Sequence, residues 1–146
     1  MWNLFTERAR RTIFLAQDEA VRLKHVSVST EHLLLGLLRE QDTVAARILD
    51  RMGINSTRLR KDVEKQAGRR EIERGVEMNL TAAGKQVINS AYEESKRIGN
   101  RYIGTEHLLL GLIRDSEGLA GRVLVKHNVG LEAARKEVMS LQDSDA

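Results

Sequence analysis

The sequence predicts an all-α fold built from two similar four-helix repeats. The segment TEHLLLGLLR, which begins at Thr30, recurs 75 residues later as TEHLLLGLIR from Thr105, and nine of the ten residues are identical. The chain has no proline and is rich in Leu, Ala, Arg and Glu, which favour helix. No run alternates between apolar and polar residues for long enough to indicate a strand. The repeat predicts two equivalent units that pack as a pseudo-two-fold pair.

Composition narrows the functional classes. At 146 residues, with 41% hydrophobic and 31% charged residues, the chain suits one soluble domain or two small halves sharing a core. The absence of cysteine excludes disulfides, thiolate metal sites and a cysteine nucleophile. No apolar run approaches the ~20 residues of a membrane span. The charged N-terminus lacks the apolar core of an export signal, so we expect a cytoplasmic protein that does not enter membranes.

The charge pattern argues against nucleic acid as the partner. The net charge is only +3, and the acidic and basic residues are interspersed, whereas nucleic-acid binding is typically marked by a strong basic stripe. Two Phe, two Tyr and one Trp are too few for a surface that stacks single strands. Nucleic-acid binding is kept as a minor alternative, and it predicts an affinity that falls steeply with salt.

The first helix is expected to begin at Thr6, whose hydroxyl can cap it, and to fade near Lys24 and His25. Its inward face carries apolar residues at helical spacing, namely Ala9, Ile13, Ala16, Ala20 and Leu23. The second helix is expected to be capped by Thr30, and its leucines cover most of the circumference, which is typical of a buried central helix. Gly36 costs this helix roughly 1 kcal/mol relative to Ala, so we expect another helix to cross closely there.

Two shorter helices complete the first repeat. The third is expected between a Thr43 cap and the Met52-Gly53 pair, and the fourth between Asn55 or Ser56 and Gly68, since glycine commonly follows a helix end. These limits place repeat one at 1–68, a polar and charged linker at 69–79, repeat two at 80–141 and a frayed polar tail at 142–146. Repeat two follows the same plan, with Thr81 aligned to Thr6 and Lys85 to Arg10.

No catalytic motif is present, and we expect no enzymatic activity, no cofactor and no metal. The chain lacks GxxxxGK[ST], HExxH and GxSxG. Glu31 and His32 are adjacent on a helix, so their side chains point about 100° apart and do not form a chelating pair. We expect His32, and His107 in the second repeat, to hydrogen-bond the neighbouring loop and fix the start of its helix.

The helix starts are the best candidates for a binding site. Unpaired backbone N–H groups and a partial positive charge at Thr30 and Thr105 attract anions. The adjoining carboxylates of Glu31 and Glu106 attract a guanidinium or an ammonium group.

Two more threonines, Thr6 and Thr81, start helices in the same halves, and each is followed four residues later by a cation, Arg10 or Lys85. A ligand with an anionic end and a guanidinium end would suit this mixture. On spacing alone the simpler interpretation is favoured, in which threonines cap helices, glutamates complement the helix dipole and the cations are solvated.

The paired TEHLLLGL segments, each preceded by a Thr-initiated helix that reads FTERAR in the first repeat, resemble the Clp N-terminal domain, particularly that of the ClpC type of AAA+ unfoldase. The resemblance covers nearly the whole chain. It implies two four-helix repeats that bind adaptor proteins and marked substrates, placed before ATPase rings that feed a ClpP-type peptidase. It also implies phosphoarginine recognition at two sites, one in each repeat.

In those sites the glutamate of each TEH motif contacts the guanidinium, while threonines and backbone donors hold the phosphate. Carried over residue by residue, the resemblance implicates Glu31 and Glu106, with four threonines near the phosphate and two less certain cations. The threonines are Thr6, Thr30, Thr81 and Thr105, and the cations are Arg10 and Lys85.

The sequence departs from the family pattern mainly in the first repeat. The family commonly has Gly before TEH, as at Gly104, but Ser29 stands there in the first copy. Thr81 is followed by Ala82 where the family often has proline, and residues 40–43 replace a Gly-rich turn. The second copy therefore matches more closely and is the better functional candidate.

The main hypothesis is a non-catalytic recognition domain of a ClpC-like unfoldase, monomeric when isolated. The alternative is a free-standing Clp accessory or adaptor protein.

Overall fold

The computed structural model describes residues 1–68 and 79–144. In that part of the chain, eight α-helices follow a single 3-10 turn, Trp2–Leu4. The helices are α1 (Glu7–Arg22), α2 (Thr30–Leu38), α3 (Val44–Arg51), α4 (Ser56–Ala67), α5 (Ala82–Arg97), α6 (Thr105–Arg114), α7 (Leu119–Lys126) and α8 (Leu131–Ser144). Extended pairing in the same residues is limited to two isolated bridges. The predicted all-α class is confirmed.

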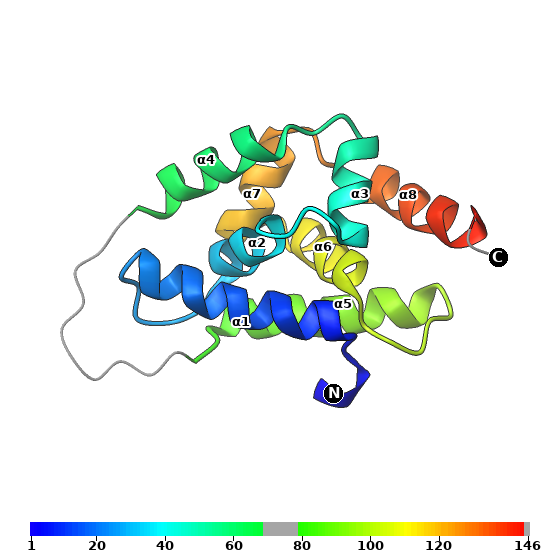
Figure 1. Cartoon of the computed structure of the whole chain (residues 1–146), viewed down its shortest axis with the longest axis horizontal. Coiled ribbons are helices and arrows are strands. Elements are labelled where there is room, and N and C mark those ends of the chain that lie inside the picture. Colours follow the sequence, from blue (N-terminus) through cyan, green and yellow to red (C-terminus); the bar gives the residue numbers. More distant parts are fainter. Residues whose placement is uncertain (69–78, 145–146) are drawn as a thin grey trace.

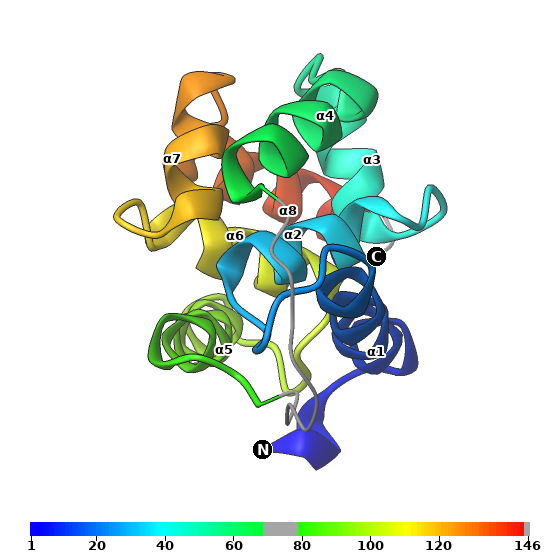
Figure 2. The same cartoon turned by 90° about the vertical axis from the view of Figure 1, so that its left-hand side faces the viewer.

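The helices form three levels. Figures 1 and 2 show α1 and α5 along one side, α2 and α6 in the middle, and α3, α4, α7 and α8 on the other side. Seen from the end, the two helices of the lower level flank the N-terminal turn (Figure 2). None of the helices in the described ranges combines the length and apolar content that crossing a bilayer requires.

The two repeats are interlaced. Helix α3 of the first repeat packs on α6 and α8 of the second, and α4 packs on α7. Within each repeat, the closest packing is between the first two helices, α1 with α2 and α5 with α6. The predicted pseudo-two-fold pair of four-helix repeats is therefore confirmed, and neither repeat buries its core alone.

The central helices are buried as their sequence predicts. Every described residue of α6 except Arg114 is buried, and in α2 only Glu31 is not. A Cβ added at Gly36 would lie 2.7 Å from the backbone nitrogen of Ala16, and one at Gly111 would lie 2.6 Å from the carbonyl oxygen of Val87. The close helix crossing predicted at Gly36 is confirmed, and it recurs in the second repeat.

Several helices begin at the residues that the sequence predicts. The Oγ1 atoms of Thr6, Thr43 and Thr81, and Oδ1 of Asn55, each accept a hydrogen bond from the backbone N–H three residues further on. These bonds satisfy N–H groups that have no partner inside the helix, and each is worth about 1 kcal/mol. Asn55, rather than Ser56, caps α4.

The expectation that Thr30 caps its own helix is wrong. Ser29 is the N-cap of α2, and the Thr30 hydroxyl instead accepts a hydrogen bond from the backbone N–H of Ala120 in α7. The N-cap of α7 is Gly118, which has no side chain with which to cap, and a Cβ there would lie 3.2 Å from Thr30 Oγ1. Thr30 therefore supplies, from the first repeat, the cap that α7 lacks.

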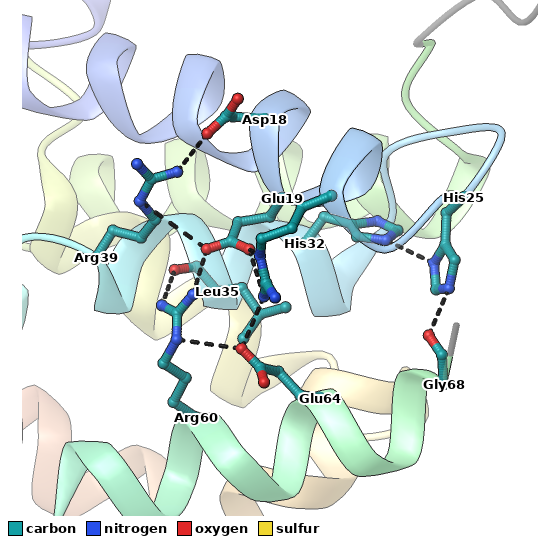
Figure 3. A network of polar contacts seen from close by, with 10 residues as sticks. Asp18, Glu19, His25, His32, Leu35, Arg39, Arg60, Glu64 and Gly68 are labelled. Carbon is teal, nitrogen blue, oxygen red and sulfur yellow. Dashed lines mark hydrogen bonds and ion pairs between the residues drawn. The ribbon is translucent and has the colours of Figure 1, made fainter. Parts of the chain in front are cut away.

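Two buried carboxylates fix the fourth helix of each repeat. Glu19 of α1 is 1% exposed and forms an ion pair with Arg60 of α4 (Figure 3). It also pairs with Arg22, whose Nη2 lies 2.7 Å from Glu19 Oε2. Glu94 of α5 is also 1% exposed, and each of its carboxylate oxygens lies 2.8 Å from a nitrogen of Arg135 in α8. These hydrogen bonds hold the pKa of Glu94 below its usual range.

The predicted linker at 69–79 lies outside the described residues except for Asn79, whose carbonyl accepts a hydrogen bond from the N–H of Val28. At the other end, α8 continues to Ser144, past residue 141 where the second repeat was predicted to end.

Candidate ligand site at two helix junctions

The candidate site residues meet at two junctions, each made by both repeats. At the first, Val28 before α2 forms a parallel bridge with Leu80 before α5; at the second, Phe5 before α1 does so with Ile103 before α6. The bridges place two helix starts side by side, α2 with α5 and α1 with α6.

The candidate residues at these helix starts form two sets. Junction one consists of Ser29, Glu31, Thr81 and Lys85. Junction two consists of Gly104, Glu106, Thr6 and Arg10.

This pairing corrects one expectation. The sequence placed Thr6 with the TEH motif of its own half, and Thr81 likewise. In the structure the backbone N–H of Thr6 donates to the carbonyl of Ile103 at 2.9 Å, and that of Thr81 donates to the carbonyl of Val28 at 2.9 Å. Each threonine therefore lies beside the TEH motif of the other repeat, because the bridges connect segments from opposite halves.

Junction one is held together by a contact between side chains. The Thr81 hydroxyl accepts the Gly84 N–H as a helix cap and also donates to Ser29 Oγ at 2.8 Å. Glu31 is only partly buried, and Lys85 is exposed. The carboxylate and the ammonium can therefore both meet a ligand from solvent.

Junction two is more enclosed. Glu106 is 5% exposed, and burial raises the pKa of its carboxyl group, while a hydrogen bond from its own backbone N–H acts in the opposite direction. The guanidinium of Arg10 lies over the Trp2 ring, with Cζ 5.8 Å from the ring centroid. Arg10 Nε is buried and, among the described residues, has no hydrogen-bond partner.

Thr30 and Thr105 do not offer their hydroxyls to a ligand. They are 2% and 3% exposed, and Thr105 Oγ1 accepts the backbone N–H of Ala45 in α3, just as Thr30 Oγ1 accepts that of Ala120. These hydroxyls join the repeats. The phosphate contacts predicted for these two residues are thereby restricted to their backbone N–H groups.

The histidines fix helix starts, as the sequence predicts. His32 Nδ1 accepts the Ser29 backbone N–H at 2.9 Å, and His107 Nδ1 accepts that of Gly104 at 2.8 Å. Each thus supplies at the third helical position the acceptor that Glu or Gln provides in a capping box. Burial lowers the pKa of both histidines to about 4, so both rings are neutral at pH 7.

Because Nδ1 of His32 accepts a hydrogen bond, the proton of this neutral ring is on Nε2. Nε2 donates it to Nδ1 of His25, 2.7 Å away. His25 Nε2 then donates to the carbonyl of Gly68 at the end of α4 (Figure 3). In the second repeat Asn100 takes the place of His25 and accepts from His107 Nε2 at 2.8 Å.

His25, Glu31 and His32 place ligand atoms within 4.8 Å of one another, close enough for a metal ion. The protonation pattern opposes one. A metal on His32 Nε2 requires a proton on Nδ1, yet Nδ1 already faces the N–H donor of Ser29. The cluster fits a shared proton better than a metal.

Sequence reasoning missed an apolar surface beside junction two. The Trp2 ring meets the Phe14 ring edge-on, with centroids 6.0 Å apart, and these side chains are 46% and 60% exposed. A small apolar cavity of about 110 Å³ adjoins Trp2 and is also lined by Phe5 and Leu80. The available signal was Phe14 itself, a large apolar residue outside the inward stripe of α1.

Comparison with known proteins gives the family. Residues 4–144 match the family described as the Clp repeat (R) N-terminal domain. The chain is 44% identical over 145 residues to the Negative regulator of genetic competence ClpC/MecB of Bacillus subtilis; this match covers 99% of the chain and 18% of that protein.

Two solved structures are similar. The N-terminal domain of the chaperone ClpD from Arabidopsis thaliana has a TM-score of 0.71 and 28% identity, covering 97% of this chain and 96% of that one. A complex of the ClpV N-domain with a VipB peptide has a TM-score of 0.66 and 14% identity, covering 90% and 89%. The family match over nearly all residues, together with the ClpC/MecB relative, shows that the chain belongs to the Clp repeat (R) N-terminal domain family.

Proposed function

We propose that the chain is the recognition domain of a ClpC-like AAA+ unfoldase and that its two junctions bind phosphorylated arginine side chains of marked proteins. The observation that carries the proposal is the composition of each junction. Two helix starts lie side by side, and between them they present backbone N–H groups, a threonine hydroxyl and a glutamate. The chain itself would bind and not catalyse.

The chemistry of phosphoarginine matches this composition. Helix starts favour a phosphate because their N–H groups are unpaired and the dipole is positive there. A carboxylate accepts hydrogen bonds from a planar guanidinium in two-pronged geometry. A ligand that carries both groups on one side chain uses both halves of the junction, whereas a phosphoserine would use only one.

The comparisons support a binding role. The similar ClpV N-domain was solved in complex with a VipB peptide, so the same fold binds a segment of another protein there. The chain spans 18% of the ClpC/MecB relative. In the proposed whole protein, cytoplasmic ATPase rings would follow the domain and pass captured substrates to a ClpP-type peptidase. Adaptor proteins would be a second class of partner.

The proposal is tested by calorimetric titration of free phosphoarginine into the wild-type domain and into Glu31→Ala, Glu106→Ala and the double variant. We expect up to two binding events in the wild type, one in each single variant and none in the double variant. Glu132→Ala, which removes a glutamate of α8 that is 77% exposed and pairs with Arg135, is the matched control and should bind like the wild type.

Arginine, inorganic phosphate and phosphoserine serve as comparison ligands. Each should bind at least about tenfold more weakly than phosphoarginine, since each lacks one of the two groups. A wild-type domain that binds none of the four compounds, or a double variant that binds phosphoarginine normally, would remove the site assignment.

A further inference from the structure

The two glutamates of the TEH motifs adopt different positions. Glu106 is 5% exposed, whereas Glu31, at the same place in an identical eight-residue segment, is only partly buried. The segment itself therefore does not set the difference. The residue before it does differ, being Gly104 in the second repeat and Ser29 in the first.

Glu106 occupies the space that a side chain at position 104 would need. The three heavy atoms nearest to a Cβ built on Gly104 all belong to the Glu106 carboxyl group; the Cβ would overlap Oε1 and lie 2.9 Å from Cδ. These atoms are the end of a flexible side chain and not backbone. A larger residue would thus be accommodated if Glu106 turned outward.

The backbone does not require glycine here. Gly104 has φ −101° and ψ −179°, and Ser29 has φ −118° and ψ −169°. Both are extended conformations that any residue adopts. The effect of glycine at position 104 is therefore the room that it leaves for Glu106.

The position of Glu106 matters because it covers the start of its own helix. The carboxylate lies against the N-cap residue Gly104, and interaction with the Glu106 backbone N–H, one of the first-turn donors that an incoming anion would use, opposes the rise of its pKa. Its negative charge also repels such an anion.

We propose that Gly104 makes junction two self-occupied, because it leaves room for the Glu106 carboxylate to cover the helix start that a phosphate group would use. At junction one, the Cβ of Ser29 takes up this space, and the Glu31 carboxylate lies instead beside the His25 and His32 rings, within 4.8 Å of their nitrogens, which leaves the helix start open. This inference rests on the proposed function. It assigns positions 29 and 104 as the determinants that make two sequence-identical motifs unequal in affinity.

Binding at junction two then begins with rotation of Glu106 out of its position. The freed carboxylate becomes available to the guanidinium of the ligand, as that of Glu31 already is. The expected result is weaker binding at junction two than at junction one.

A reciprocal exchange tests the inference. Gly104→Ser should turn Glu106 outward and tighten phosphoarginine binding at junction two by roughly tenfold. Ser29→Gly should let Glu31 fold back and weaken binding at junction one. Ser29→Ala separates the two parts of the serine side chain: it removes the hydroxyl bonded to Thr81 but keeps the Cβ, so Glu31 should keep its position and junction one should bind more tightly than in Ser29→Gly.

Two readouts separate this inference from the proposed function. The first readout needs no ligand and follows the carboxyl groups of Glu31 and Glu106 by NMR as the pH is changed. In Gly104→Ser, the raised pKa of Glu106 should return to the ordinary range. The second is phosphoarginine binding, followed at each junction by amide shifts.

An unchanged Glu106 titration in Gly104→Ser overturns the inference, whatever the binding result. If the Glu106 titration shifts in Gly104→Ser but phosphoarginine binds junction two with unchanged affinity, the Glu106 carboxylate does not compete with the ligand, and the inference is overturned. If no variant binds phosphoarginine but the titration moves, the proposed function fails and the control of Glu106 by position 104 stands.

Discussion

The two junctions share a framework and differ in their accessible side chains. Both use a parallel bridge, a threonine cap from the opposite repeat and a histidine that accepts the N-cap N–H. Junction one has a serine hydrogen-bonded to Thr81 and a partly buried glutamate, whereas junction two has a glycine and a buried glutamate. Identity of the motif therefore guarantees the same helix start but not the same binding surface.

The difference shows that likeness to the family motif and burial of the motif glutamate are separate properties. Gly104 makes the second copy the closer match to the family pattern, yet the same glycine allows Glu106 to cover the helix start. The framework is maintained by buried groups that both repeats keep, and the surface is set by neighbours that they do not share. The following predictions test how far the equivalence of the repeats extends.

The largest expected effect is acid destabilisation through His32 and His107. Both have a folded pKa of about 4 against 6.5 for the free side chain, so below pH 6.5 the unfolded chain gains protons that the folded chain does not. Stability is fully present above pH 6.5 and is lost as the pH falls. Between pH 6.5 and 5, the loss should be about 2 kcal/mol for each histidine and about 4 kcal/mol for the two together.

Urea unfolding across this pH range measures the loss. His32→Gln and His107→Gln keep an acceptor for the N-cap N–H and should each remove about half of the pH dependence. If one variant removed nearly all of it, the two helix starts would not be equivalent.

Replacement of the buried glutamates should show a smaller and unequal loss. Glu94→Gln should cost about 3 kcal/mol and Glu19→Gln about 2 kcal/mol, because a buried ion pair is broken in each. Glu94→Gln leaves Arg135 without its charged partner, and this side chain is 16% exposed. Glu19→Gln leaves Arg60, which is 29% exposed and is solvated more easily.

Urea unfolding at pH 7 gives both values. Glu132→Gln is the control, since this glutamate pairs with the same Arg135 but is 77% exposed, and its loss should stay below about 0.5 kcal/mol. Equal losses at Glu19 and Glu94 would contradict the role assigned to arginine exposure.

Much of this framework could be predicted from the sequence because it depends on local patterns. The apolar stripe of α1, the leucine-rich α2 and the glycine at its crossing each identify a helix or its packing within a few residues. The contacts across the repeats could not be predicted in this way. Nothing near Thr30 in the sequence indicates that its hydroxyl caps α7, because that depends on a glycine at position 118.

The candidate site follows the same division. The sequence identified Glu31, Glu106 and the threonines of both junctions, but it placed Thr6 and Thr81 with the wrong TEH motifs. It also gave no sign that Glu106 is buried, because this follows from the volume of a neighbouring side chain.

Loss of the threonine hydroxyls that join the repeats should have a smaller effect. Thr30→Val and Thr105→Val each leave one helix N–H without its partner, at a cost of about 1 kcal/mol. Thr30→Val should cost more, because α7 has only Gly118 at its N-cap while α3 also has the Thr43 hydroxyl. Thermal unfolding of the two variants, compared with Thr12→Val as a threonine that bonds within its own helix, measures the difference.

The smallest expected effect concerns the residues that connect each histidine to a fourth helix. His25 links His32 to Gly68 at the end of α4, and Asn100 links His107 to Gln142 of α8 through hydrogen bonds of 2.8 Å. His25→Asn should keep the bond to His32, as Asn100 keeps the bond to His107, and lose only the contact with Gly68.

We expect a loss below about 1 kcal/mol for His25→Asn, confined to the last turn of α4. Gln142→Ala is the counterpart in the second repeat and should loosen the end of α8 alone. Amide hydrogen exchange reports both ends separately. Faster amide hydrogen exchange throughout α2 in His25→Asn would contradict the equivalence of His25 and Asn100. It would mean that Asn cannot hold His32 as Asn100 holds His107.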